Sequence, residues 1–164
     1  MGTIALVLII IVLLFGFVVA FGAPYLPTLK KQTDEALDLL DLKPGHTLLE
    51  LGCGDGRVML AAAKRGLQVT GYELNPLLAI TARLVTWRYR KTTRVVWGNF
   101  WHKTWPETDA IFVFLLDRYM KKLDTKIIQQ RHKQQHSIKL LSFTFKVPGR
   151  KPHRTKGGLY LYEY

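Results

Sequence analysis

The sequence has little cysteine and little acid. Cys53 is the single thiol among 164 residues, which excludes an intramolecular disulfide framework and suits a reducing compartment. The paired Cys and His spacings that mark zinc sites are absent as well. Only 12 Asp and Glu accompany 24 Lys and Arg, so the formal net charge is +12. These absences leave a reduced, strongly basic protein without a structural zinc module.

Charge is missing altogether from the start of the chain. No charged side chain occurs in residues 1–23, where Ile, Leu, Val and Phe dominate. About 20 apolar residues in a helix cross a bilayer core, so we expect a transmembrane anchor at residues 1–23. A cleaved signal peptide is the alternative, because Ala20, Phe21 and Gly22 place small residues near a possible cleavage point. No basic residue precedes the run, and the run is longer than a typical signal h-region, which favours the retained anchor.

The basic residues indicate the orientation of the protein in a membrane and its binding partners. Lys30 and Lys31 follow the apolar run, so the positive-inside rule places the rest of a single-pass membrane protein on the cytoplasmic side. The net charge is compatible with attraction to anionic lipid, with nucleic-acid binding and with solubility alone. The expected anchor favours membrane lipid as a partner. The absence of an aromatic-interleaved RNA motif makes nucleic acid the less favoured one.

The rest of the chain alternates between strands and helices. We expect an elbow and a helix in residues 24–43, with Thr33 as the helix N-cap, followed by one domain at 44–164. The alternation predicts an α/β, Rossmann-like, mostly parallel sheet with helices on both faces. The basic loop at 146–156 contains no helix, so the last strand is expected to be antiparallel. The expected strands are 47–51, 68–73, 94–97, 110–115, 138–145 and 159–164, and the expected helices are 33–42, 58–65, 75–89 and 120–130.

A glycine-rich loop follows the first strand. Gly52, Gly54 and Gly56 stand at alternate positions directly after an apolar run that contains Glu50. Glycines permit a sharp strand-to-helix turn and let a ligand approach the backbone. The spacing is G-x-G-x-G, whereas a dinucleotide fingerprint reads G-x-G-x-x-G. A carboxylate before the loop would also repel a pyrophosphate and attract an ammonium group, which favours S-adenosylmethionine over NAD.

The other strand ends carry polar groups of the right kind for the same ligand. Glu73 ends the second strand and suits the two hydroxyl donors of a ribose. Asn99 follows the third strand and Asp117 the fourth. Carboxyl ends of parallel strands meet at one edge of a sheet, where open α/β sheets bind their ligands. A joint site is therefore favoured over three unrelated turn residues.

With these motifs the chain resembles the class I, seven-strand S-adenosylmethionine-dependent methyltransferases. The resemblance rests on LLELGCGDGR, VTGYELNP, VVWGNFW and AIFVFLL, which span most of residues 44–120. The apolar start, PYLPTLKKQ, GYELNP and SFTFKVPG make it similar to the small membrane-anchored protein-lysine methyltransferases of the ADP/ATP carrier and ATP synthase c-subunit type. The resemblance implies a protein substrate at a membrane and S-adenosyl-L-methionine as cofactor.

The resemblance also implies roles for individual residues. Asn99 stands where the family usually has Asp, and its amide oxygen can accept the same bond from the adenine amino group. Phe100 is expected to pack on the adenine, and Glu73 to hold the ribose. The expected cofactor-binding residues are Glu50, Gly52, Cys53, Gly54, Glu73, Leu74, Asn99 and Phe100.

The sequence after the fourth strand differs from the motif that many amino-methyltransferases have at this position. It reads Leu116-Asp117-Arg118-Tyr119 and lacks a proline pair, which disfavours methylation of nucleobases and their exocyclic amines. A lysine acceptor must lose a proton before it attacks, because its ordinary pKa is about 10.4. We therefore expect Asp117, and after it Tyr119, as the catalytic residues, with a helix N-cap as the alternative role of Asp117.

Several other side chains are weaker candidates for functional residues. His132 and His136 stand four apart, which suits metal binding on one helical face, but their Arg, Lys and Gln neighbours favour a solvated face, and we expect no metal. Trp97, Trp101 and Trp105 are candidates for a substrate groove or for core or membrane-interface packing. The favoured function is lysine methylation of a membrane protein. The alternatives are a small-molecule, lipid or RNA acceptor, and a non-catalytic protein that binds S-adenosylmethionine.

Overall fold

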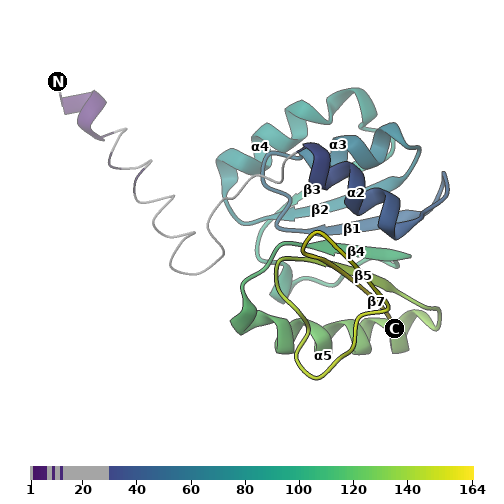
Figure 1. Cartoon of the computed structure of the whole chain (residues 1–164). Helices are drawn as coiled ribbons and strands as arrows, with labels where there is room; N and C mark the ends of the chain where they lie inside the picture. The colour runs from purple at the N-terminus through teal and green to yellow at the C-terminus, as the bar shows by residue number, and fades with distance from the viewer. Residues whose placement is uncertain (1, 7–8, 10–11, 13–29) are drawn as a thin grey trace.

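The computed structural model describes residues 2–6, 9, 12 and 30–164 of the chain (Figure 1). Most of the anchor expected at 1–23, and the elbow as far as residue 29, lie outside these residues. Among the residues that are described, no helix is both long enough and apolar enough to cross a bilayer.

Seven strands in the described part of the chain form one sheet, in the order β3-β2-β1-β4-β5-β7-β6. The first five are parallel, and β7 is antiparallel to both β5 and β6. The expected mostly parallel sheet with an antiparallel last strand is confirmed. The short β6 lies in the segment expected to be a loop, and it forms through its pairing with β7. The strands are β1 Thr47–Leu51, β2 Gln68–Glu73, β3 Thr93–Trp97, β4 Ala110–Val113, β5 Lys139–Phe143, β6 Arg154–Lys156 and β7 Leu159–Glu163.

Helices cover both faces of the sheet, as expected. Figure 1 shows α2, α3 and α4 on one face and α5 on the other. The helices are α2 Lys30–Leu40, α3 Arg57–Lys64, α4 Pro76–Val85 and α5 Asp117–Gln134, with 3₁₀ turns η1 Trp87–Tyr89 and η2 Phe100–His102. Thr33 was wrongly expected as an N-cap. It is buried inside α2, which begins three residues earlier, because its side chain packs against the domain.

The core has two halves, one on each face of the sheet. In β1, Leu48 packs with α2 and α3, whereas Leu49 and Leu51 pack with α5. A parallel strand that is covered on both faces reads as a continuous apolar run, which is how β1 was recognisable in the sequence. Glu50 interrupts that run and is buried with it.

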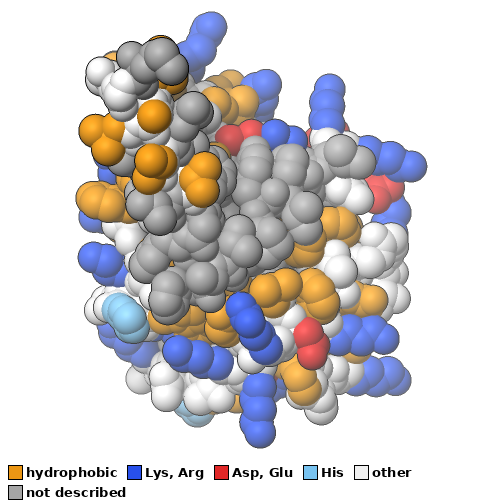
Figure 2. Space-filling view, turned by 90° about the vertical axis from the view of Figure 1, so that its left-hand side faces the viewer, with side chains coloured by type: hydrophobic (Ala, Val, Ile, Leu, Met, Phe, Trp, Pro, Cys, Tyr) orange, Lys and Arg blue, Asp and Glu red, His pale blue; other side chains and the backbone are white. Residues whose placement is uncertain are grey.

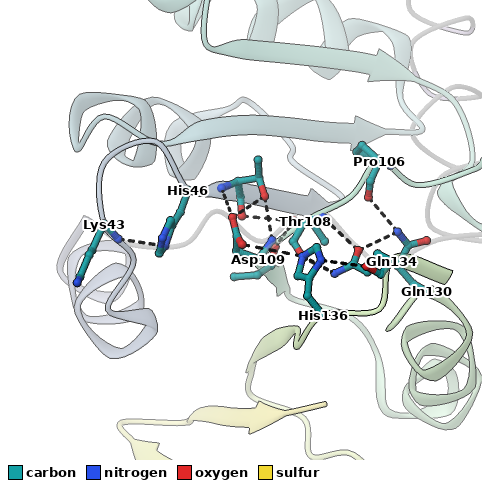
Figure 3. Close-up of polar contacts among 10 residues, drawn as sticks. Lys43, His46, Pro106, Thr108, Asp109, Gln130, Gln134 and His136 are labelled. Carbon is teal, nitrogen blue, oxygen red and sulfur yellow. Dashed lines mark hydrogen bonds and ion pairs between the residues drawn. The ribbon is translucent and has the colours of Figure 1, made fainter. Parts of the chain in front are cut away.

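A polar brace ties the amino-terminal ends of the strands together (Figure 3). Asp109 Oδ2 accepts hydrogen bonds from the backbone N–H and the hydroxyl of Thr47, at 2.7 and 2.8 Å. The Asp109 carbonyl accepts from the N–H of Lys139, so one residue links the starts of β1, β4 and β5. Burial raises the pKa of Asp109, but the two hydrogen bonds from Thr47 and the charges of His46 and His136 together outweigh it, and the pKa is lowered overall.

The two histidines of the sequence motif do not share a helical face. Helix α5 ends at Gln134, and Gln135 takes a left-handed conformation with φ of 58°. His136 therefore belongs to the polar brace, with Nε2 4.0 Å from Asp109 Oδ1. No group of three His, Cys, Asp or Glu suited to a metal occurs among the residues described.

We predict that Asp109→Asn lowers the free energy of unfolding by about 1–2 kcal/mol at pH 7, because it weakens two hydrogen bonds to a charged acceptor. A depressed pKa means that the difference from wild type is present above pH 3.8 and disappears as Asp109 protonates at lower pH. Urea unfolding at pH 7 and near pH 3 measures both effects. Asp38→Asn, which removes an exposed pair with Arg65, is the control and should change stability little. If both variants lost the same free energy of unfolding, the stabilising role assigned to the Asp109 brace would be contradicted.

Candidate active site at the carboxyl edge of the sheet

The carboxyl ends of β1, β2 and β4 lie side by side. In the register of the sheet, Leu51 pairs with Tyr72 on one side and with Val113 on the other. The glycine loop leaves β1 at this edge, and the N–H groups of Gly52 and Cys53 both donate to the Tyr72 carbonyl at 2.9 Å. The loop is therefore held directly against the end of β2.

The glycines of the loop have different functions. Gly52 has φ of 83°, and a Cβ at this position would meet open space. Gly56 also has φ of 83°, but its Cβ would lie 2.9 Å from Ala82, so this glycine lets α3 and α4 pack closely. Gly52 is thus the position where the backbone is bare toward a ligand, and Gly56 serves the core.

Glu73 organises the loop. Its Oε2 accepts from the N–H of Gly54 and its Oε1 from the N–H of Asn75, both at 2.8 Å. The side chain is buried, with 6% of its surface exposed. Asn75 in turn accepts from the N–H of Leu77 at 2.9 Å and caps α4 at the position where the sequence pattern predicts that this helix begins. Glu73 therefore positions the site backbone, and each of its oxygens retains a lone pair for the expected ribose contact.

Glu50 is buried without a full set of partners. Only 3% of its surface is exposed, and its Oε2 has no hydrogen-bond partner in the described part of the chain. Burial, followed by the charges of Asp55 and Glu73, raises the pKa of Glu50 well above its usual value, against a backbone hydrogen bond with Met59. A buried acceptor of this kind is costly unless a donor completes it. The site therefore fits a ligand that carries a positively charged donor.

The Cys53 thiol turns into the core. It is 3% exposed, and a Cβ on Gly71 would approach its Sγ to 2.9 Å. Burial, and after it the charges of Glu50 and Glu73, raise the pKa of the thiol well above its usual value, so it is not a nucleophile. Any contact of Cys53 with a ligand is left to its backbone. The glycine of the GYELNP motif has its own function, since it makes room for this thiol.

The expected adenine end of the site lies where β2 and β3 finish. The N–H of Gly98 donates to the Glu73 carbonyl at 2.8 Å and joins the two strand ends. Leu74 is half-buried, and its carbonyl accepts from Trp97 Nε1 at 3.1 Å. Asn99 Oδ1 accepts from the N–H of Trp101 at 2.9 Å and caps η2. Phe100 follows, half-buried, as the first residue of that turn.

The two expected catalytic residues begin α5. The N-cap of α5 is Leu116, which has no capping side chain, so the alternative role of Asp117 as an N-cap is wrong. Asp117 is instead the first helical residue and is exposed. Tyr119 is half-buried, and its ring centroid lies 6.2 Å from that of Trp101. The aromatic contact links the start of α5 to the end of β3, and the catalytic roles stay predictions.

Two lysines of α5, which the sequence patterns did not single out, also lie close to this edge of the sheet. Lys122 Nζ lies 4.6 Å from the centre of the Trp101 ring, and Lys126 Nζ lies 4.8 Å from that of Trp105. Lys126 also donates to the Trp101 carbonyl at 3.0 Å, and burial, then the charge of Lys122, lowers its pKa. Their spacing of four residues on one helix is the signal that could have found them. Trp105 itself is a core residue, with 3% of its surface exposed.

The surface around this edge is basic. Figure 1 places the C-terminus, which follows antiparallel β7, on the right, so the parallel strands run to the left. Figure 2 looks onto that left-hand side, where, among the side chains coloured by type, Lys and Arg are frequent around the rim and acidic side chains are few. Such a face attracts anionic partners.

Comparison with known proteins decides the family. Residues 50–154, more than half of the chain, match the family model described as the ANTKMT methyltransferase domain. The chain belongs to this methyltransferase family. The matched range contains every expected site residue, from Glu50 to Tyr119.

Named relatives agree with the family. The ATP synthase c-subunit lysine N-methyltransferase of Homo sapiens is 31% identical over 106 residues, which are 63% of this chain and 45% of that protein. The adenine nucleotide translocase lysine N-methyltransferase of Mus musculus is 36% identical over 107 residues, 63% and 46% of the two chains. The expected resemblance is confirmed, although the chain spans only about half the length of these two relatives.

A solved structure shows the same fold. The RNA methyltransferase from Salinibacter ruber in complex with S-adenosyl-L-homocysteine superposes with a TM-score of 0.73 and 24% sequence identity. The match covers 85% of this chain and 92% of that one. The sheet described above therefore has the same fold as that solved structure.

We predict opposite effects on stability for two carboxylate-to-amide changes at this site. Glu50→Gln should stabilise the ligand-free protein by about 1–3 kcal/mol at neutral pH, because it replaces a buried carboxyl group whose ionised form the fold disfavours. Glu73→Gln should destabilise it by about 1–3 kcal/mol, because an amide nitrogen cannot accept from a backbone N–H. Urea unfolding without ligand measures both.

The pH dependence checks the same point. A raised pKa in the folded state means that Glu50 is best accommodated when protonated, so wild-type stability should fall as pH rises from 4.5 toward neutral. Glu50→Gln should lack that fall. A Glu50→Gln protein that is less stable than wild type at every pH would show that the carboxylate is not an unpaired charge.

Proposed function

We propose that the chain is an S-adenosylmethionine-dependent protein-lysine N-methyltransferase held at a membrane by residues 1–23, with its catalytic domain on the cytoplasmic side. The observation that carries the proposal is Glu50, a buried carboxylate whose Oε2 lacks a partner among the described residues, beside a backbone that is bare at Gly52. The family match and the lysine methyltransferases among the relatives support it.

The methyl donor suits this arrangement of residues. Its ammonium group would complete the Glu50 carboxylate, which a pyrophosphate could not do. Its ribose hydroxyls would take the remaining lone pairs of Glu73, beside Leu74. Its adenine would lie at Asn99 and Phe100, and the backbone of Gly52, Cys53 and Gly54 would border its methionine part. When bound, the sulfonium supplies an activated methyl group and leaves as a neutral thioether.

The chain itself supplies alignment and proton removal. Methyl transfer is an in-line displacement whose leaving group needs no acid, so holding the reactants in line can contribute about 7–11 kcal/mol. The Asp117 carboxylate at the start of α5 accepts the proton of the lysine ammonium before attack. Tyr119, held against Trp101, borders the path of the acceptor.

The acceptor is proposed to be a lysine of a membrane protein. Two observations support it. The relatives are named for lysine methylation of the ATP synthase c-subunit, and of the adenine nucleotide translocase. The apolar run of residues 1–23 is also suited to keep the domain at a membrane. Membrane lipid is the second proposed partner, on the basis of the net charge of +12.

Donor binding is tested with two ligands that differ in one part. S-adenosylhomocysteine carries the amino-acid group, and 5′-methylthioadenosine lacks it. Glu50→Gln should lower the affinity for S-adenosylhomocysteine about 10–100-fold and leave the affinity for 5′-methylthioadenosine unchanged, because only the first ligand offers an ammonium group. Glu73→Ala should weaken both, because both carry the ribose. Isothermal titration measures all four affinities.

Glu107→Gln is the matched control, an exposed carboxylate at the opposite edge of the sheet. It should bind both ligands as wild type does. Equal weakening of the two ligands by Glu50→Gln would contradict the assigned contact with the amino-acid end.

The acceptor is tested by incubating membranes with the full chain and S-adenosylmethionine labelled in its methyl group. We expect label in protein, bound to lysine, that survives nuclease and lipid extraction. Asp117→Asn should lower kcat about 10²–10⁴-fold with donor affinity unchanged, and the deficit should shrink as pH rises toward the pKa of lysine.

Tyr119→Phe, which keeps the ring against Trp101, should retain more activity than Tyr119→Ala. Label confined to lipid, RNA or a small molecule would overturn the lysine acceptor. Donor binding without any transfer would indicate a non-catalytic binding protein.

A further inference from the structure

Helix α4 presents its large apolar side chains to the outside. Leu77, Ile80 and Leu84 follow the helical period, and Trp87 in η1 continues the same stripe. They are exposed, with 69% of Leu84 and 61% of Trp87 accessible. Trp97 at the end of β3 is also exposed, at 59%, and its Nε1 bonds to Leu74 just before α4. We call these five residues the outer apolar face.

The inner side of α4 is made of small residues. Ala79 and Ala82 are its fully buried positions, and Ala82 lies so close to the glycine loop that a Cβ on Gly56 would come within 2.9 Å. A helix on the surface of a soluble domain normally does the reverse, with large apolar residues inward and polar residues outward. The inversion leaves contiguous apolar surface in water, which marks an interaction site.

The chain segment that carries this surface is rich in basic side chains. No Asp or Glu occurs between Leu74 and Gly98, whereas the segment contains Arg83, Arg88, Arg90, Lys91 and Arg94. All five are exposed. The Arg90 guanidinium lies 5.1 Å from the centre of the Trp87 ring, and Arg83 reaches the carbonyl of Val95 on the edge strand β3 at 3.3 Å. Cations therefore lie against and beside the apolar stripe.

We propose that the outer apolar face is a membrane-docking surface, and that its occupant is the headgroup and upper acyl region of an anionic bilayer. Leu and Trp on one face with Arg and Lys around it is the composition of helices that lie in a membrane interface. Trp is favoured at that depth because its ring is apolar and its N–H polar. The positive charge provides the complementarity that a second copy of this basic surface would lack.

Docking through this face would set the height of the active site above the membrane. Helix α4 and Glu73 are joined through Asn75, and Trp97 ends the strand that leads to Asn99. The proposed lysine acceptor lies in a membrane protein, so a domain docked through α4 and Trp97 would hold its site near the bilayer surface. The docking surface itself follows from the residues of α4 and β3 and stands whether or not the proposed acceptor is correct.

The test uses the full chain in vesicles of phosphatidylcholine and phosphatidylserine with brominated acyl chains. The protein has four tryptophans, at positions 87, 97, 101 and 105. Bromolipid should quench Trp87 and Trp97, so their joint change to Phe should remove the quenched fluorescence. Ile80→Glu with Leu84→Glu keeps all four tryptophans and should also abolish quenching. Raised salt, or vesicles of phosphatidylcholine alone, should reduce it.

Thr125→Glu with Gln129→Glu is the matched control, because it makes the same charge change at positions of α5 on the other face of the sheet. It should be quenched as wild type is. Quenching that persists in Ile80→Glu with Leu84→Glu overturns the proposal. So does a wild-type dimer in detergent that becomes a monomer in this variant, since the occupant is then a second copy.

S-adenosylhomocysteine binding is measured in the same vesicles, which separates this inference from the proposed function. Both pairs of glutamate substitutions should bind it as wild type does, and this also shows that they fold. Wild-type protein that is quenched but does not bind the ligand would contradict the proposed function and leave the docking surface standing.

Discussion

Both oxygens of Glu73 accept backbone N–H groups, one from Gly54 in the loop after β1 and one from Asn75 at the start of α4. This pair of bonds joins two strand ends and two helix starts that are about 20 residues apart in the chain. The left-handed glycine loop, the capped α4 and the carbonyl of Glu73 that receives Gly98 are all arranged around it. The buried Glu73 carboxylate accepts the hydrogen bonds of the two backbone turns that form the candidate site, and so holds these turns in place.

The two acidic residues of the site have different roles, Glu73 in holding the fold and Glu50 in the proposed ligand binding. Glu73 is hydrogen-bonded on both oxygens, which favours the ligand-free fold, whereas Glu50 is buried with an oxygen that has no partner in the described part of the chain, which we expect to disfavour it. A carboxylate retained at such a cost is expected where a ligand completes it.

Close packing beneath the loop also shapes the outside of the molecule. Gly56 and Ala82 bring α3 and α4 together, so α4 can turn only small residues inward. Its large apolar residues are left on the surface, beside an edge strand and a set of exposed arginines. The geometry that forms the site thus also creates the apolar, basic surface that we propose docks on a membrane.

Local patterns in the chain were enough to locate β1 and β2, the glycine loop and the Asn75–Pro76 start of α4, because apolar runs, glycines and caps act over a few residues. They also predicted that most strands are parallel and that β7 is antiparallel, since a connection that contains a helix returns the chain to the same edge of the sheet and the segment before β7 contains no helix. Long-range packing decided the rest. Thr33 lies within α2, β6 pairs with β7, α5 begins at Asp117, and the Cys53 thiol faces Gly71 because of contacts that no local pattern specifies. That Glu50 Oε2 has no hydrogen-bond partner among the described residues could be known only from the tertiary structure, which gives the neighbouring donors their positions.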